Sequence, residues 1–78
     1  MTPKTVKYVI GLALANAGIH RFEEAARRLR ISRSYFSLIL SCERRPARYQ
    51  KALARLCAKR PEDLFGQFTN PDLKEDVA

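Results

Sequence analysis

The chain has 78 residues, of which 46% are hydrophobic and 29% are charged, so we expect one small folded domain rather than wholesale disorder. A net charge of +7 favours a polyanionic partner. Two cysteines and one histidine are too few for a disulfide scaffold or a four-ligand zinc site, so we expect reduced thiols in a cytoplasmic protein without a metal or cofactor.

The first predicted element is a helix from Pro3 to about Ala17. Thr2 suits the N-cap, Pro3 suits the first helical position, and Gly18 ends the helix. Its apolar side chains recur at the i, i+3, i+4 and i+7 spacing of a core-facing helix: Val6, Val9, Ile10, Ala13, Leu14 and Ala17. The segment also resembles a secretory signal with a cleavage site at residues 15–17, but cleavage would remove this core helix. A secreted cationic peptide is therefore the weakest hypothesis, and no apolar run reaches membrane-spanning length.

Residues 22–41 hold two helical patterns separated by a short polar joint. The first pattern runs from about Phe22 to Leu29, with a small Ala26 where two helices must cross closely. The second runs from about Arg33 to Ser41, and Ser32 is a good N-cap for it. Two helices joined by about three residues have the layout of a helix-turn-helix, whose second helix is free to enter a DNA groove.

The remaining chain predicts two further helices and a tail. A basic loop over residues 42–48 precedes a helix from about Ala47 to Lys59, which carries Cys57 on its apolar stripe as a packed core thiol. Pro61 begins a short fifth helix that ends at Gly66. We therefore expect an all-α domain of five helices in residues 1–68, followed by an acidic, disordered tail in residues 69–78.

The charge is unevenly distributed along the chain. Residues 1–60 hold 14 Lys and Arg against three Glu, a net charge of +11, whereas residues 61–78 have a net charge of −4. Within the basic part, Glu23–Arg27 and Glu24–Arg28 have the favourable i, i+4 spacing of helical ion pairs. We therefore interpret Arg27 and Arg28 as paired surface residues rather than as DNA contacts.

This pattern resembles the lambda-repressor-like helix-turn-helix family, which includes Cro and the XRE-type regulators, over about residues 5–66. The family has Ala in the middle of the first motif helix, with apolar residues one before it and three after it. It has an apolar residue and a capping Ser in the turn, and two inward residues in the recognition helix. The matching residues here are Ala25, Ala26, Leu29, Ile31, Ser32, Phe36 and Ile39.

Three residues depart from the family pattern. Arg30 stands where the turn commonly has a left-handed Gly, which costs on the order of 1 kcal/mol for a residue with a Cβ. Cys42 stands where a Gly often closes the recognition helix. Phe22 stands where a polar residue often touches DNA; we expect it to point inward, with Arg21 or His20 taking over the phosphate contact.

The resemblance and the residue chemistry together predict the DNA contacts. Arg33 lies in the first turn of the recognition helix, where its guanidinium can donate to guanine O6 and N7, and Leu38 can contact a thymine methyl group. Short serine side chains let the backbone approach the bases closely. The predicted base contacts are Arg33, Ser34, Ser37 and Leu38, and the predicted phosphate contacts are Arg21, Ser32, Ser41, Arg44, Arg45 and Arg48.

We therefore expect a sequence-specific regulator of phage or prophage repressor type that binds a double-stranded operator as a homodimer. Spare apolar residues such as Tyr8 and Leu12 predict a partner surface, and both the first helix and the C-terminal segment are open as the dimer interface. The alternative function is an antitoxin or antirepressor that uses the same fold to hold a protein. No enzyme, membrane or small-molecule ligand is expected, because one histidine without a phosphate loop or paired carboxylates provides no catalytic site.

Overall fold

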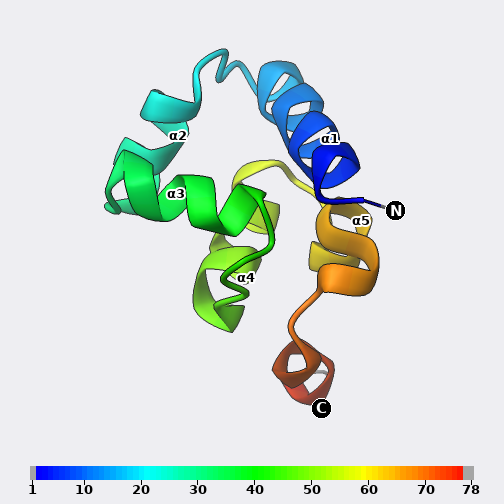
Figure 1. Cartoon of the computed structure of the whole chain (residues 1–78). Helices are drawn as coiled ribbons and strands as arrows, with labels where there is room; N and C mark the ends of the chain where they lie inside the picture. Colours follow the sequence, from blue (N-terminus) through cyan, green and yellow to red (C-terminus); the bar gives the residue numbers. More distant parts are fainter. Residues whose placement is uncertain (1, 77–78) are drawn as a thin grey trace.

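The computed structural model describes residues 2–76, and the side chains of residues 2–73. This part of the chain is all-helical, as predicted, and contains no strand. Figure 1 shows the helices in chain order: α1 (Pro3–Asn16), α2 (Phe22–Leu29), α3 (Arg33–Leu40), α4 (Ala47–Leu56), α5 (Pro61–Phe65), and the 3-10 helices η1 (Gly66–Phe68) and η2 (Pro71–Asp76). The C-terminal residues 77–78 of the predicted tail lie outside the described residues.

Helix α1 begins at the predicted cap, because the Thr5 N–H donates to the Thr2 side-chain oxygen at 3.2 Å. It ends where Gly18 adopts a left-handed φ of 87° and the Ile19 N–H donates back to the Leu14 carbonyl at 2.8 Å. Ile19 is then buried, which the sequence analysis did not anticipate, whereas Ala17 at the helix end is exposed rather than part of the core stripe. The buried face of α1 consists of Val6, Ile10, Ala13 and Leu14.

The joint between α2 and α3 has the predicted backbone. Arg30 is left-handed, with φ 59° and ψ 41°, and the following Ile31 N–H donates to the Ala26 carbonyl at 3.1 Å. Ser32 then caps α3 by accepting the Tyr35 N–H at 3.0 Å. Three residues therefore end one helix, turn the chain and start the next.

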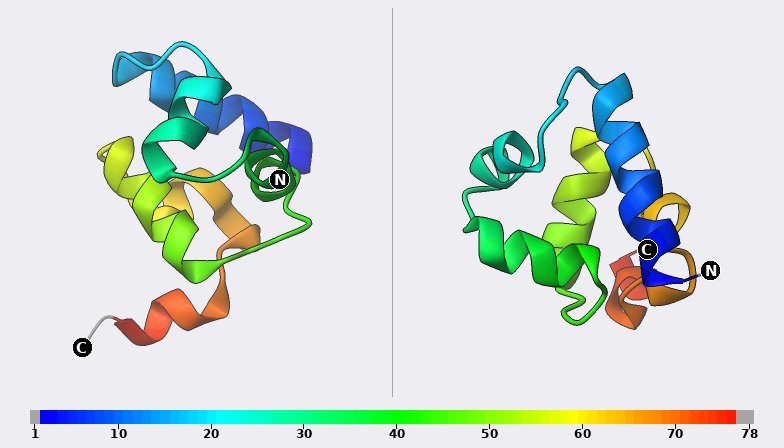
Figure 2. Two further views of the ribbon diagram at one scale, coloured as in Figure 1. Left: turned by 90° about the vertical axis from the view of Figure 1, so that its left-hand side faces the viewer. Right: turned by 45° about the horizontal axis from the view of Figure 1, so that its top comes forward.

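The core lies where all five helices converge. Figure 1 and Figure 2 show α2 and α3 on one side of the molecule, α1 and α5 on the other, and α4 between them. Helix α4 ends earlier than predicted, because Ala58 is left-handed and the Lys59 N–H donates to the Ala54 carbonyl at 2.9 Å. The largest fully buried apolar side chains come from every helix except α2, which contributes the small Ala25 and Ala26: Ile10, Leu14, Phe36, Ile39, Leu53, Leu64 and Phe65.

The chain after η1 differs from the disordered tail that the sequence predicted. Gln50 of α4 is 1% exposed, and its Nε2 donates to the Phe68 carbonyl at 3.0 Å. Its Oε1 accepts the Asn70 N–H at 2.7 Å, while the Asn70 side chain donates to the Arg45 carbonyl. Leu73 is also buried, so residues 69–73 belong to the folded unit. The acidic composition of this segment did not reveal that one buried amide would hold it.

Replacing Arg30 by Gly is expected to stabilise the protein. The left-handed backbone at Arg30 is strained for a residue with a Cβ, so Arg30→Gly is expected to raise the free energy of unfolding by about 0.5–1 kcal/mol in urea titrations. The matched control is Arg27→Gly, at an exposed position inside α2, which is expected to lower it by about 1 kcal/mol. Equal destabilisation by both variants would contradict a left-handed Arg30.

Replacing Gln50 by Leu is expected to release the C-terminal segment. The variant keeps the side-chain size but leaves the Phe68 carbonyl and the Asn70 N–H without their partner, which costs about 1–3 kcal/mol of unfolding free energy. Amide hydrogen exchange is expected to accelerate at Asn70 and Leu73, with Arg55→Leu, an exposed change in the same helix, as control. Unchanged exchange at Asn70 would contradict this account of the segment.

Candidate nucleic-acid interface

The four predicted base-contact residues share one side of α3. Arg33, Ser34 and Ser37 are exposed and Leu38 is half-buried, whereas Phe36 and Ile39 are buried on the opposite side. This division follows from the helical period of 3.6 residues. Two of the outward side chains are serines, so the α3 backbone is only thinly covered there.

The Arg33 side chain is folded back onto the protein. Its Nη1 donates to the Ser37 side-chain oxygen at 2.5 Å, and its Cζ lies 5.6 Å from the centre of the Phe22 ring. A guanidinium over an aromatic face is attracted by the ring's negative quadrupole. In this conformation Arg33 lies between α2 and its own helix rather than projecting straight from α3.

Phe22 occupies the space between α1, α2 and α3. Its ring lies 5.8 Å from that of Phe36, so the expected inward orientation is present, although Phe22 is only half-buried. Lys7 of α1 lies over the same ring, with its Nζ 6.0 Å from the ring centre. Phe22 therefore has a cation from α1 and a cation from α3 beside it.

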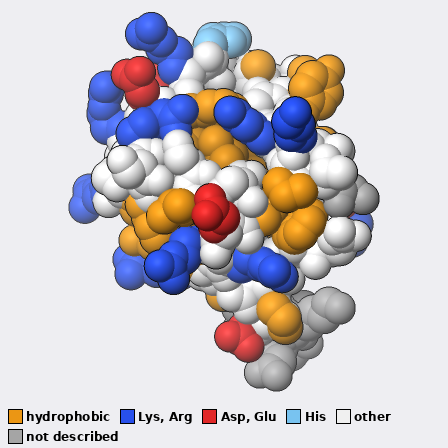
Figure 3. Space-filling view, viewed as in Figure 1, with side chains coloured by type: hydrophobic (Ala, Val, Ile, Leu, Met, Phe, Trp, Pro, Cys, Tyr) orange, Lys and Arg blue, Asp and Glu red, His pale blue; other side chains and the backbone are white. Residues whose placement is uncertain are grey.

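A groove of about 350 Å³ runs between the start of α1 and the outward side of α3. Lys4, Lys7 and Arg33 bring three positive charges to it, and Glu43 brings one negative charge. Its polar lining also includes Ser37 and Ser41, and the Ser41 hydroxyl donates to the Glu43 carboxylate at 2.8 Å. Figure 3 shows this face of the molecule, where Lys and Arg side chains surround exposed hydrophobic ones. The groove can hold an anion.

Sequence reasoning missed Lys4 and Lys7 as members of this site. They are separated from α3 along the chain by the whole of α2, and only the packing of α1 against α3 brings them to the groove. A helical projection of α1 already places both lysines off the Val6–Leu14 core stripe. That projection gives their exposure but not the neighbour that they face.

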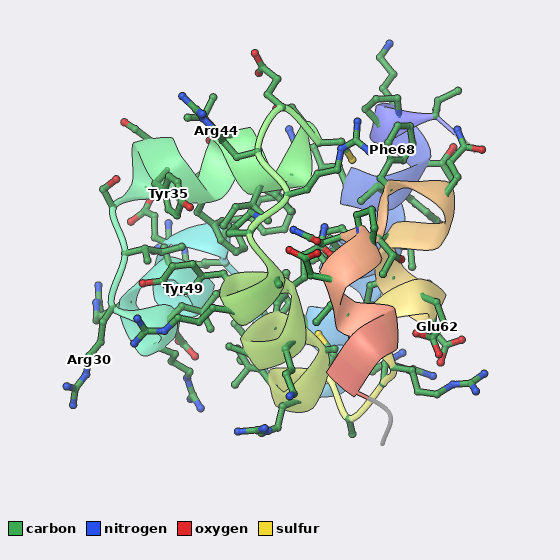
Figure 4. All side chains as sticks on the ribbon, turned by 90° about the horizontal axis from the view of Figure 1, so that it is seen from below. Arg30, Tyr35, Arg44, Tyr49, Glu62 and Phe68 are labelled. Atoms are coloured by element: carbon green, nitrogen blue, oxygen red, sulfur yellow. The ribbon has the colours of Figure 1, made fainter. Side chains whose placement is uncertain are left out.

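The loop after α3 is held close to the end of that helix. Cys42 is left-handed, with φ 65°, and the N–H groups of Glu43 and Arg44 both donate to the Leu38 carbonyl, at 3.1 and 3.2 Å. Figure 4 shows the Arg44 side chain beside α3. The predicted phosphate contact Arg44 is therefore exposed next to the candidate recognition helix.

Two other predicted phosphate contacts rest on aromatic rings. The Cζ of Arg45 lies 5.6 Å from the Phe68 ring centre, and that of Arg48 lies 5.4 Å from the Tyr49 ring centre. Tyr49 in turn packs edge-on against Tyr35 of α3 at 5.8 Å, as the two labelled rings in Figure 4 show. These ring contacts restrict where both guanidinium groups can lie.

Arg21 lies at the start of α2 and is not part of the loop that follows α3. It is the N-cap residue of α2 without a side-chain cap hydrogen bond, and it lines a small hollow of about 90 Å³ together with Gly11 and Phe22. The loop with Arg44 and Arg45 follows the C-terminal end of α3. Ser32, which caps the N-terminal end of α3, is exposed. The predicted phosphate contacts therefore do not form a single cluster.

Both cysteines are buried free thiols, which confirms the packing expected for Cys57. Burial raises the pKa of the Cys42 thiol, and Arg45 lowers it by a smaller amount. Burial likewise raises the pKa of the Cys57 thiol, against a smaller lowering by Lys59. Both thiols are therefore protonated at neutral pH and are poor nucleophiles. Among the described residues, no three His, Cys, Asp or Glu side chains gather where they could hold a metal ion.

No family model, curated protein or solved structure matches this chain. Similarity to known proteins therefore assigns neither a family nor a function. Among the helices in residues 2–76, none combines the length and the apolar character that crossing a bilayer requires.

Proposed function

We propose that this chain is a cytoplasmic, sequence-specific regulator that binds double-stranded DNA through a helix-turn-helix of the lambda-repressor-like kind. In this proposal α2 and α3 are the two motif helices, and α3 enters the major groove. The observation that carries the proposal is the exposed serine side of α3, which has basic side chains near it from α1, from α3 itself and from the following loop.

The size and surface of α3 suit a major groove. An α-helix with its side chains is about 10–12 Å in diameter, close to the width of the major groove in B-DNA. Ser34 and Ser37 are short enough for the helix to approach base edges. Arg33 then donates to guanine once its side chain leaves Ser37, and Leu38 contacts a thymine methyl group.

Cations on several sides of α3 support a phosphate clamp. Lys4 and Lys7 lie across the groove from Arg33, while Arg44, Arg45 and Arg48 follow α3 in the chain. Contacts of this kind fix the position of a protein on the duplex and supply sequence-independent affinity. Arg21, Ser32 and Ser41 complete the proposed phosphate contacts.

We also propose that the protein acts as a repressor of phage or prophage type and binds a two-fold operator as a homodimer, with half-sites about one helical turn apart. Repression then results from occupancy of the operator. The alternative function is an antitoxin or antirepressor module, and a specific observation favours it: α1 exposes the large apolar side chains of Tyr8 and Leu12 to solvent.

Two alanine variants test the division between base and phosphate contacts. On a duplex selected from random DNA, Arg33→Ala is expected to cost about 1–3 kcal/mol and to relax sequence preference at one position. Arg45→Ala is expected to weaken binding to all duplexes alike and to reduce the slope of log K against log salt by about 1. Fluorescence anisotropy over a salt series measures both effects.

The control for this series is Arg55→Ala, which removes an exposed positive charge from α4. It is expected to change binding less than either variant above. Equal losses from Arg33→Ala on selected and scrambled duplexes would exclude Arg33 as a base contact. No binding of the unaltered protein to any duplex at low salt would exclude the proposed function itself.

A further inference from the structure

The side of α1 that faces away from the core has two large exposed apolar side chains. Tyr8 is 68% exposed and Leu12 is 54% exposed, whereas the core side of the helix holds Val6, Ile10 and Leu14. The DNA-binding proposal gives Tyr8 and Leu12 no role, because neither lines the groove between α1 and α3. Exposed apolar side chains of this size, gathered on one helix face, indicate a surface that another molecule covers.

This surface is hollowed in a way that suits a helix. A depression of about 580 Å³ lies along α1, lined by the apolar residues Tyr8, Gly11, Leu12, Ala15 and Phe22. Gly11 and Ala15 are small and follow each other at i, i+4, so they form a low strip beside the larger side chains. A Cβ at position 11 would lie 3.4 Å from the Phe22 ring, so the glycine keeps this strip open. Apolar side chains of a second helix fit into such a strip.

The charged residues around the depression indicate which kind of molecule binds there. Its charged lining residues are Lys4 and Lys7, and residues 1–22 contain no Asp or Glu. A second copy of this chain, paired through α1, would bring two more lysines and no carboxylate from that helix. Outside its grooves, double-stranded DNA presents a charged phosphate backbone, which would not cover Tyr8 and Leu12. A helix with acidic side chains beside an apolar stripe matches both the apolar floor and the basic edge.

We propose that the depression on α1 docks an amphipathic helix of a partner protein, with apolar side chains at i, i+4 and i+7 and Asp or Glu side chains beside Lys4 and Lys7. Lys4 and Lys7 also line the groove between α1 and α3. A docked acidic helix therefore neutralises two cations of the DNA site. Partner and DNA bind competitively, and this second part of the proposal rests on the proposed function.

Three synthetic 14-residue helical peptides test the docking. The first has a leucine stripe flanked by glutamates, the second keeps the leucines but has lysines in place of the glutamates, and the third keeps the glutamates but has glutamines in place of the leucines. Only the first is expected to bind the full chain, with amide chemical-shift changes centred on Tyr8, Leu12 and Ala15. The other two are expected to bind at least about tenfold more weakly, because the second peptide lacks the acidic side chains and the third lacks the apolar stripe.

Variants of the full chain locate the site. Leu12→Ser is expected to weaken the first peptide about tenfold and to leave DNA affinity unchanged, because Leu12 lines only the apolar depression. Lys7→Gln is expected to weaken both the peptide and DNA, and Arg55→Gln, the charge control outside both grooves, is expected to weaken the peptide less than Lys7→Gln. Far-ultraviolet circular dichroism of each variant verifies that it is folded.

Several results would overturn the docking proposal. Equal binding of all three peptides, binding of none, or shift changes confined to α4 and α5 would each do so. Sedimentation of the unaltered protein as a dimer that Leu12→Glu dissociates would assign the surface to a second copy instead. If the first peptide binds at Tyr8 and Leu12 while no duplex binds at all, the docking surface stands and the DNA-binding proposal fails. If the first peptide and DNA both bind but the peptide does not displace DNA, the proposed competition between partner and DNA is wrong.

Discussion

The whole exposed face of α3 depends on the three-residue turn from Arg30 to Ser32. A left-handed Arg30 directs the Ile31 N–H back to Ala26, and Ser32 starts the next helix with a side-chain hydrogen bond. Ile31 is partly buried against the core, so the turn is anchored as well as tight. One residue more would rotate α3 by about 100°, which would bring its serines out of the position they now hold. The strain at Arg30 is thus the local cost of a fixed α3.

Features set by neighbouring residues could be predicted from the sequence. The Thr2 and Ser32 caps and Pro61 at the start of α5 depend on chemistry within a few residues, whereas the left-handed Arg30 was expected from the family resemblance. The helical period of α3 likewise divided buried Phe36 from exposed Ser34 and Ser37. These features are local, and the starts of α1, α3 and α5 follow from them, whereas the end of α4 at Leu56 did not.

Features set by residues far apart could not be predicted. Gln50 holds the segment after η1 through hydrogen bonds that span 18 and 20 residues, so the composition of that segment alone suggested disorder. Lys4 and Lys7 reach the groove beside α3 only through helix packing. Arg33 was expected to project outward, but its interaction with Ser37 and Phe22 depends on where the Phe22 ring lies. Sequence periodicity indicates which side chains are exposed, but it does not indicate which residues they contact.

Phe22 links the two grooves of the molecule. It lies beside Lys7 and Arg33, and it also lines the apolar depression on α1. One of the three residues that depart from the pattern of the resembling family therefore stands where the basic and the apolar surfaces meet. Since Lys4 and Lys7 belong to both grooves, a ligand on either surface changes the charge that the other ligand meets.

Selection of bound sequences from a pool of random duplex DNA tests whether α3 reads bases in the major groove. A regulator that inserts α3 into the major groove is expected to enrich one short motif, repeated with two-fold symmetry and half-sites about one helical turn apart. Binding that enriches no sequence over the starting pool, and that disappears uniformly as salt rises, would show that the basic side chains bind phosphate without any reading of bases and would contradict the account.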